Sequence, residues 1–240
     1  MARLRLICCD TRPDIAKASR QLWTRWADAA ELDGFDSVAV SCETVQAGRW
    51  YLSNWAGALM FTRRGEITLA VDSDVLPLPG AVVRRSDVEP GPGYCLTGCL
   101  AEYSADIMRR AIMSGFWPDP MVDYLTTSVV GLDVFKIRRA LTRTVERGRS
   151  VNWECEEPAA ECSIRQVSGM PSRTMLRRYV EDVWVYLADG AETVVKNGGA
   201  FIHFGGPHKG AFAESAAKLW GVDYERFRKS PHEFGKHAGR

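Results

Sequence analysis

The stretch Ile67-Thr68-Leu69-Ala70-Val71-Asp72-Ser73-Asp74 decides the fold. Its first five residues are apolar or β-branched, which is typical of a strand that is buried on both faces of a sheet. Two aspartates follow at once, and Pro77 comes soon after them. Because proline cannot donate a hydrogen bond to a strand ladder, we expect the aspartates where the strand ends. The stretch therefore predicts two carboxylates at the carboxyl end of a central strand.

Strand patterns alternate with helical patterns on both sides of this stretch. Short apolar or β-branched runs predict further strands over residues 4–9, 37–41, 94–101, 126–134 and 200–202. Helical patterns cover residues 15–32, 48–62, 104–114, 135–149 and 172–188. This alternation predicts an α/β fold with a mainly parallel central sheet and helices on both faces. Since no linker divides the chain, we expect one domain over residues 1–229 and a flexible tail over 230–240.

Composition and charge narrow the class of protein. The chain has 240 residues, of which 46% are hydrophobic and 25% charged, as in an ordinary soluble globular protein. Its net charge of +1 argues against a protein that binds polyanions over its whole surface. No apolar run is long enough to span a bilayer, and no signal-peptide pattern opens the chain. The seven cysteines then suit a reducing compartment, and we expect a cytoplasmic protein.

The aspartate pair is a candidate cation site. Carboxylate oxygens suit manganese or magnesium, and open α/β sheets bind ligands at the carboxyl ends of their strands. A turn that carries two solvated aspartates is the alternative that Asp72 and Asp74 leave open when they are considered alone.

A second group of polar residues lies near the C-terminus. The run His203-Phe204-Gly205-Gly206-Pro207-His208-Lys209 follows the predicted strand over 200–202. An imidazole can add a metal ligand, glycines let backbone amides approach phosphate, and a lysine can neutralise phosphate charge. The same run is also consistent with a core histidine, a tight turn and a surface lysine.

The two groups together resemble a known family. Asp-x-Asp after an apolar strand, with His-x-x-Gly-x-x-Lys near the C-terminus, is similar to the metal-dependent GT-A glycosyltransferases of the glycogenin and bacterial galactosyltransferase type. The resemblance implies a GT-A fold that transfers a sugar from a nucleotide-diphosphate donor, such as a UDP-sugar. It implies that Asp72, Asp74 and His203 hold manganese or magnesium. The donor-binding residues that we expect with it are Asp10, Arg12, Ser73, Gly205, Gly206 and Lys209.

The acidic pair Glu181-Asp182 has two interpretations. In a helix over 172–188, both residues lie off the apolar stripe and on a solvated face. If the helix instead begins near Val180, the pair lies at its N-terminus and projects into the cleft. By the resemblance, Glu181 and Asp182 would then be the catalytic pair, which binds the acceptor or takes its proton. Retention and inversion of the anomeric configuration both stay open.

The predicted helix over 135–149 is strongly basic. Its cationic residues are Lys136, Arg138, Arg139, Arg143, Arg147 and Arg149. Such a stretch is consistent with a solvated face, with an anionic acceptor such as DNA, or with a membrane surface. The acceptor therefore stays open between a modified DNA base, a protein and a glycan.

Two other functions compete with this interpretation. A nucleotidyltransferase or a sugar-nucleotide hydrolase on the same fold should carry a glycine-rich loop near the N-terminus, and residues 6–14 contain no glycine. The other alternative is a non-enzymatic domain that binds nucleic acid through its basic helix.

Overall fold

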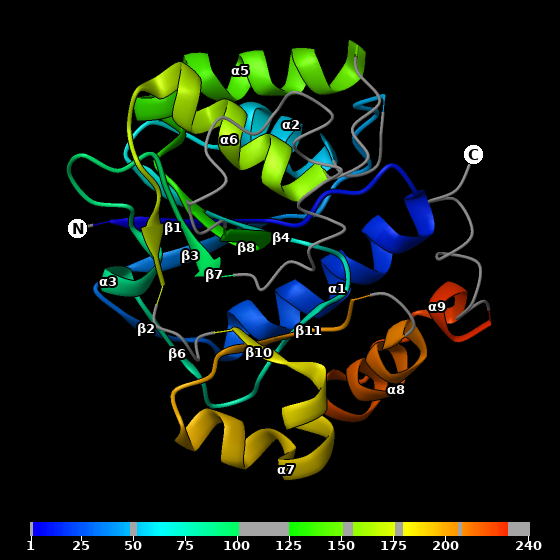
Figure 1. The fold of residues 1–240 in the computed structure, drawn as a ribbon. Coiled ribbons are helices and arrows are strands. Elements are labelled where there is room, and N and C mark those ends of the chain that lie inside the picture. Colours follow the sequence, from blue (N-terminus) through cyan, green and yellow to red (C-terminus); the bar gives the residue numbers. More distant parts are fainter. Residues whose placement is uncertain are drawn as a thin grey trace.

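The computed structural model describes residues 2–48, 52–100, 125–150, 156–175, 180–205 and 208–229. Its centre is a six-stranded sheet in the order β3-β1-β4-β8-β7-β9 (Figure 1). Strands β3, β1 and β4 are parallel, as are β7 and β9, whereas β8 is antiparallel to both of its neighbours. The strand bounds are β1 Arg3–Ile7, β3 Ser37–Ser41, β4 Glu66–Val71, β7 Leu96–Leu100, β8 Leu125–Leu132 and β9 Arg173–Thr174. The predicted α/β fold with a mainly parallel, mixed sheet is confirmed.

Strand β4 lies inside the sheet, and all six of its residues are buried. Leu69 and Val71 pack into the core on one face of the sheet, and Ala70 packs into the core on the other. Helix α1 (Pro13–Ala29) covers the first face, and helices α2 (Ser53–Phe61), α5 (Val134–Ser150) and α6 (Glu156–Ser168) cover the second (Figure 1). Helices on both faces were predicted from the sequence, and this prediction is confirmed.

A smaller sheet joins the first at the carboxyl end of β4. It has the order β10-β11-β5, in which β10 and β11 are parallel and β5 is antiparallel to β11. Trp23 and Trp26 of α1 contact Phe201 of β11, with ring centroids 6.0 and 6.3 Å apart, so α1 packs against both sheets. The bounds here are β5 Val75–Pro77, β10 Val180–Asp182, α7 Val183–Lys196, β11 Phe201–His203, α8 Lys209–Trp220 and α9 Glu225–Lys229.

Two of the predicted helices are wrong over part of their length. Residues 172–188 do not form one helix, because Arg173–Thr174 pairs with β7 and Val180–Asp182 pairs with β11 before α7 begins. The helix predicted over 15–32 ends at Ala29, and Glu31–Asp33 forms β2, which pairs with β6 (Val82–Arg84) ahead of α3 (Arg85–Val88). In both places strand pairing with distant residues outweighs the local helical period.

Some predicted features lie outside the described residues. These are the helix predicted over 104–114, the tail over 230–240 and Gly206. Among the residues that the structure describes, none of the helices is long and apolar enough to cross a membrane.

A buried ion pair joins β1 to β4 at the edge of the sheet opposite the aspartates. Arg5 donates two hydrogen bonds to Glu66, of 2.9 and 2.8 Å, and Glu66 also accepts the backbone N–H of Arg63 at 2.8 Å. Burial raises the pKa of Glu66, but the hydrogen bonds from Arg5 and Arg63 outweigh it and leave the pKa lowered. Glu66 is therefore an anion at neutral pH, held by two neighbouring segments.

We expect Glu66→Ala to lower the free energy of unfolding by about 3 kcal/mol at pH 7, because the Arg5 guanidinium stays buried without its carboxylate. Since the pKa of Glu66 is lowered from 4.5, its ionised form stabilises the fold above that pH, and this contribution is lost as the pH falls through the folded-state pKa. Denaturant unfolding should therefore show the difference between variant and wild type shrinking below pH 4.5.

The matched control is Glu43→Ala, which removes the carboxylate of the exposed pair with Arg20. It should cost less than about 1 kcal/mol, because exposed ion pairs are solvated and screened. An equal loss in both variants would contradict a stabilising role for the buried pair.

Candidate functional site

The aspartates lie where the chain leaves the large sheet for the small one. Asp72 follows the last residue of β4, and its backbone N–H donates to the carbonyl of Ser128 at 2.8 Å. The turn closes when the N–H of Val75 donates to the carbonyl of Asp72 at 3.2 Å. Asp74 is held in turn by the N–H of Phe204, which donates to its carbonyl at 3.0 Å. Backbone hydrogen bonds from both sheets therefore fix the position of the pair.

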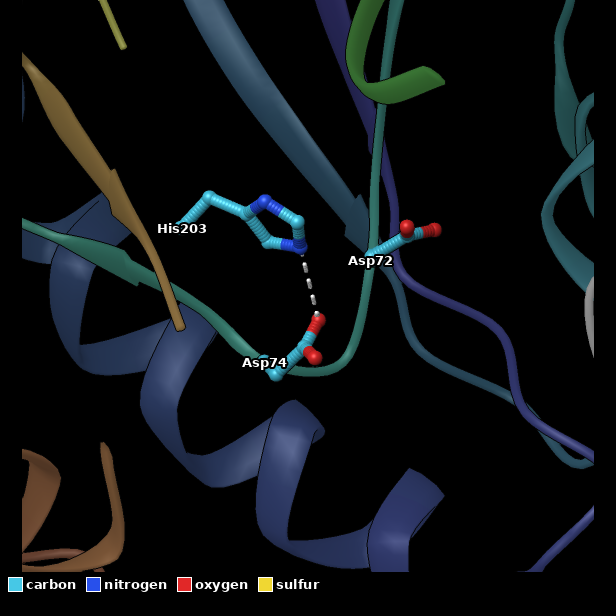
Figure 2. A group of neighbouring side chains, drawn as sticks. All are labelled: Asp72, Asp74 and His203. Atoms are coloured by element: carbon cyan, nitrogen blue, oxygen red, sulfur yellow. Dashed lines mark ion pairs between the residues drawn. The ribbon is translucent and has the colours of Figure 1, made fainter. Parts of the chain in front are cut away.

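Pairing between β5 and β11 brings His203 to the aspartates. Val75 is in register with His203 across this antiparallel pair, so the imidazole emerges beside Asp74. Figure 2 shows the ring pointing towards Asp74, with 3.7 Å between Nε2 of His203 and Oδ1 of Asp74. One ligand atom from each of Asp72, Asp74 and His203 lies within 4.8 Å of the others. The three side chains thus converge, as the sequence predicted.

This donor set fits a divalent cation. Two carboxylates and an imidazole are ligands that manganese accepts, and magnesium accepts the carboxylates. Asp72 is further oriented by Asn54, whose side-chain amide donates to its Oδ1 at 3.0 Å. An outer hydrogen bond of this kind is typical of carboxylates that bind metal.

Asp74 is the most buried member of the group, at 6% exposed. Burial raises the pKa of its carboxyl group, but the ammonium of Lys209 and the imidazole of His203 lower the pKa by more than burial raises it. The pKa therefore lies below its ordinary value. Lys209 hydrogen-bonds and ion-pairs with Oδ2 of Asp74 from the start of α8. Asp74 therefore stays an anion at neutral pH, and a cation already neutralises it.

A second carboxylate–cation pair lies in the loop after β1. Arg12 donates to Asp10 through Nε at 2.7 Å and through a terminal nitrogen at 2.6 Å, and Asp10 is buried. The ring of Phe227 in α9 lies below both site cations, with its centroid 5.7 Å from Cζ of Arg12 and 5.2 Å from Nζ of Lys209. An aromatic ring at these distances attracts cations, so α9 helps to hold both side chains.

The structure places the remaining predicted residues as follows. Ser73 is half-buried between the aspartates. Gly205 lies against the imidazole, because a Cβ built on it would be 3.2 Å from Cε1 of His203, so a larger residue would push on the ring. Glu181 and Asp182 are the last residues of β10, and Asp182 is in register with His203 across the pair of strands. The structure does not describe the side chains of Glu181 and Asp182.

Asn54 is a site residue that the sequence analysis missed. Its amide donates to the carbonyl of Val71 at 2.8 Å as well as to Asp72, and its oxygen accepts the N–H of Cys9 at 2.7 Å. Gly57 lets helix α2 approach Cys9 closely enough for these hydrogen bonds, because any residue with a Cβ would clash: a Cβ built on Gly57 would be 2.6 Å from Sγ of Cys9. The sequence offered one indication of this role, which is the amide side chain of Asn54 within the mainly apolar run Leu52-Ser53-Asn54-Trp55-Ala56.

Comparisons with known proteins support the fold. No protein-family model and no curated protein matches this chain. Among solved structures, it is similar to a glycosyltransferase involved in the glycosylation of the major capsid of PBCV-1, with a TM-score of 0.51 and 15% identity. The match covers 85% of this chain and 93% of that chain. This chain has the fold of a GT-A glycosyltransferase. A likeness at this identity concerns the fold, so the activity has to be argued from the site.

We expect Asn54→Asp to destabilise the protein by about 2 kcal/mol or more, because an amide that donates to two acceptors becomes a third acceptor facing them. Chemical denaturation at pH 7 measures the loss. The control is Asn197→Asp at an exposed position, which should change stability by less than about 1 kcal/mol. Equal stability of Asn54→Asp and wild type would contradict the role of Asn54 as the link between Cys9 after β1, Val71 of β4 and Asp72.

Proposed function

We propose that this protein is a metal-dependent glycosyltransferase, with one catalytic domain over residues 1–229, which transfers a sugar from a nucleotide-diphosphate donor to an acceptor. The observation that carries the proposal is the convergence of Asp72, Asp74 and His203 at the carboxyl end of β4. The shared fold supports it, but one fold can serve several reactions, so the chemistry rests on this group.

The proposed roles follow from charge and position. Asp72, Asp74 and His203 would hold manganese or magnesium, which when bound acts as a Lewis acid for the departing diphosphate. Lys209 lies at the same carboxylate and would turn its ammonium to a phosphate oxygen. We assign backbone contacts with the diphosphate to Gly205 and Gly206.

We assign the nucleotide to the loop that follows β1, beside the aspartates. Asp10 and Arg12 follow β1, at the same edge of the large sheet as Asp72, and Ser73 lies between the aspartates. Asp10 is buried and already held by Arg12, so this loop is ordered before a ligand binds. A UDP-sugar is the donor that we propose to test first.

We propose that Glu181 and Asp182 face the acceptor. The register between Asp182 and His203 supports this, because it brings the end of β10 beside the metal group. If one of these carboxylates takes the acceptor proton, the reaction inverts the anomeric configuration. If the pair only binds the acceptor, retention is expected. The configuration of the product therefore distinguishes the two roles.

The proposal predicts that UDP binds only weakly without metal, because the Asp72 carboxylate repels a diphosphate and Asp74 keeps the ammonium of Lys209 engaged until a divalent cation binds to the pair. Calorimetric titration of UDP with and without manganese measures this difference. Asp72→Asn and His203→Ala should each lower the manganese-dependent affinity by at least about 100-fold. Asp36→Asn, exposed at the opposite edge of the sheet, is the control and should bind as wild type does. Failure of manganese to promote binding of any nucleoside diphosphate would overturn the proposal.

Lys209→Met should change the two affinities in opposite directions. Without the ammonium at Asp74, manganese alone should bind more tightly, because it no longer competes with Lys209 for this carboxylate. UDP should bind about tenfold more weakly in the presence of manganese, because a charged hydrogen bond to phosphate is lost. Separate titrations of manganese and UDP test this, with the exposed Lys218→Met on the same helix as control. Loss of both affinities would show that Lys209 only supports the local structure.

A further inference from the structure

The exposed face of helix α5 concentrates positive charge. Six of the helix's residues are cationic and one, Glu146, is acidic. Because the net charge of the whole chain is only +1, the rest of the chain is net acidic, so this charge is local. The basic face of α5 consists of Lys136, Arg138, Arg139, Arg143, Arg147 and Arg149, and all six are exposed.

The opposite face of α5 is fully used by the fold. Val134, Ile137, Leu141 and Val145 are buried in the core beneath the helix. A helix that lies in a membrane needs an apolar face to insert among the lipids, and α5 has already buried its own. The basic face therefore favours a partner that is bound through charge at its surface, and five of its six cations are arginines, which bind phosphate through two parallel hydrogen bonds.

The cations are arranged along the helix. Arg139, Arg143 and Arg147 follow one another at intervals of four residues, so their backbone positions rise by about 6 Å each along one side. Between α5 and α6 a cavity of about 450 Å³ is lined by Arg143 and Arg147, with Glu146, Ser163 and Val167. A phosphodiester chain can follow such a row, and the cavity gives one phosphate group room between two arginines.

Aromatic side chains lie at the other end of the basic face. Phe135 is 41% exposed at the start of α5, and Cζ of Arg138 lies over its ring at 5.6 Å. Tyr94 is 38% exposed, and its backbone carbonyl accepts a hydrogen bond of 2.9 Å from Lys136. Exposed aromatic rings beside a row of cations are the combination that binds single-stranded nucleic acid, because unpaired bases stack on the rings. Duplex DNA and lipid headgroups offer no free base for this contact.

The C-terminal end of α5 leads to the candidate site. Nε of Arg149 donates to the carbonyl of Ala47 at 3.2 Å, in the loop that follows β3. In the same loop, the N–H of Val45 donates to the carbonyl of Asp10 at 2.9 Å. The basic face therefore runs from the exposed aromatic residues to the edge of the sheet at which the donor is proposed to bind.

We propose that the basic face of α5 binds single-stranded nucleic acid through its phosphates, with Phe135 stacking on a base. That single-stranded nucleic acid is the acceptor rests on the proposed glycosyltransferase function. The binding of the strand to α5 does not depend on the metal group. The surface thus selects an anionic, unpaired strand and directs it towards the donor.

The test is fluorescence anisotropy of a labelled oligo-thymidine strand, titrated with full-length protein over a range of salt concentrations. We expect the triple variant Arg139→Gln, Arg143→Gln, Arg147→Gln to bind more than tenfold more weakly at 0.1 M salt. The screening length at this salt concentration is about 10 Å, so direct contacts between arginine and phosphate are still effective. Its plot of log affinity against log salt should be flatter by about 2, because three phosphate contacts to a single strand are lost. Phe135→Ala should weaken binding about tenfold without changing the slope.

The matched control removes three exposed cations elsewhere, as Arg63→Gln, Arg64→Gln, Lys196→Gln, and should bind the strand as wild type does. Equal losses in the two triple variants would overturn the proposal, as would tighter binding to a duplex or to vesicles containing phosphatidylserine. Manganese-dependent UDP binding should be unchanged in the Arg139→Gln, Arg143→Gln, Arg147→Gln variant. Unchanged UDP binding would show that this variant is folded. Asp72→Asn should lose UDP binding and keep strand binding, so failure of one proposal is distinguishable from failure of the other.

Discussion

The candidate site depends on the three-residue link Asp72-Ser73-Asp74, which carries the chain from one sheet into another. Strand β4 is buried on both faces and ends at Val71, and β5 begins at Val75 in the smaller sheet. Both ends of the link are therefore held by strand hydrogen bonds, and the carboxylates have little freedom to move apart. Pairing of β5 with β11 then adds His203, from a distant part of the sequence, to the same place. A site positioned by backbone pairing is organised before any ligand binds.

Charge neutralisation is the second constraint on this site. A carboxylate as buried as Asp74 is costly to ionise unless cations lie close to it, and Lys209 provides one at the start of α8. Asp10 has the same need and is paired with Arg12. Because the ring of Phe227 lies beneath both cations, the short helix α9 packs against the two pairs together. The elements near the C-terminus thus complete a site whose three aspartates Asp10, Asp72 and Asp74 come from the first third of the chain.

The parts of this arrangement that follow from local pattern could be predicted from the sequence. The apolar run before Asp72 predicts a buried strand, whereas the meeting of Asp72, Asp74 and His203 was implied only by the resemblance of the two polar groups to a known family. Asn54 could not be predicted, because its three hydrogen bonds go to segments that only the fold brings together. The helix predicted over 172–188 was wrong because its helical period is locally satisfactory, whereas the pairing of Val180–Asp182 with β11 depends on residues that follow α7. The alternative start near Val180 lies close to the observed start of α7 at Val183.

The net charge of +1 hides two opposed surfaces, and their opposition has a consequence for anionic ligands. The end of β4 presents two carboxylates, of which Asp74 is already paired with Lys209, and the diphosphate proposed to bind there would need a divalent cation to offset the remaining negative charge. The basic face of α5 attracts phosphates without any metal. Because exposed charges are screened over about 8–10 Å, each surface acts mainly on what touches it. Under the two proposals a diphosphate and a phosphodiester strand are therefore not equivalent competitors: the first would need the metal group, and the second would be held by arginines outside it.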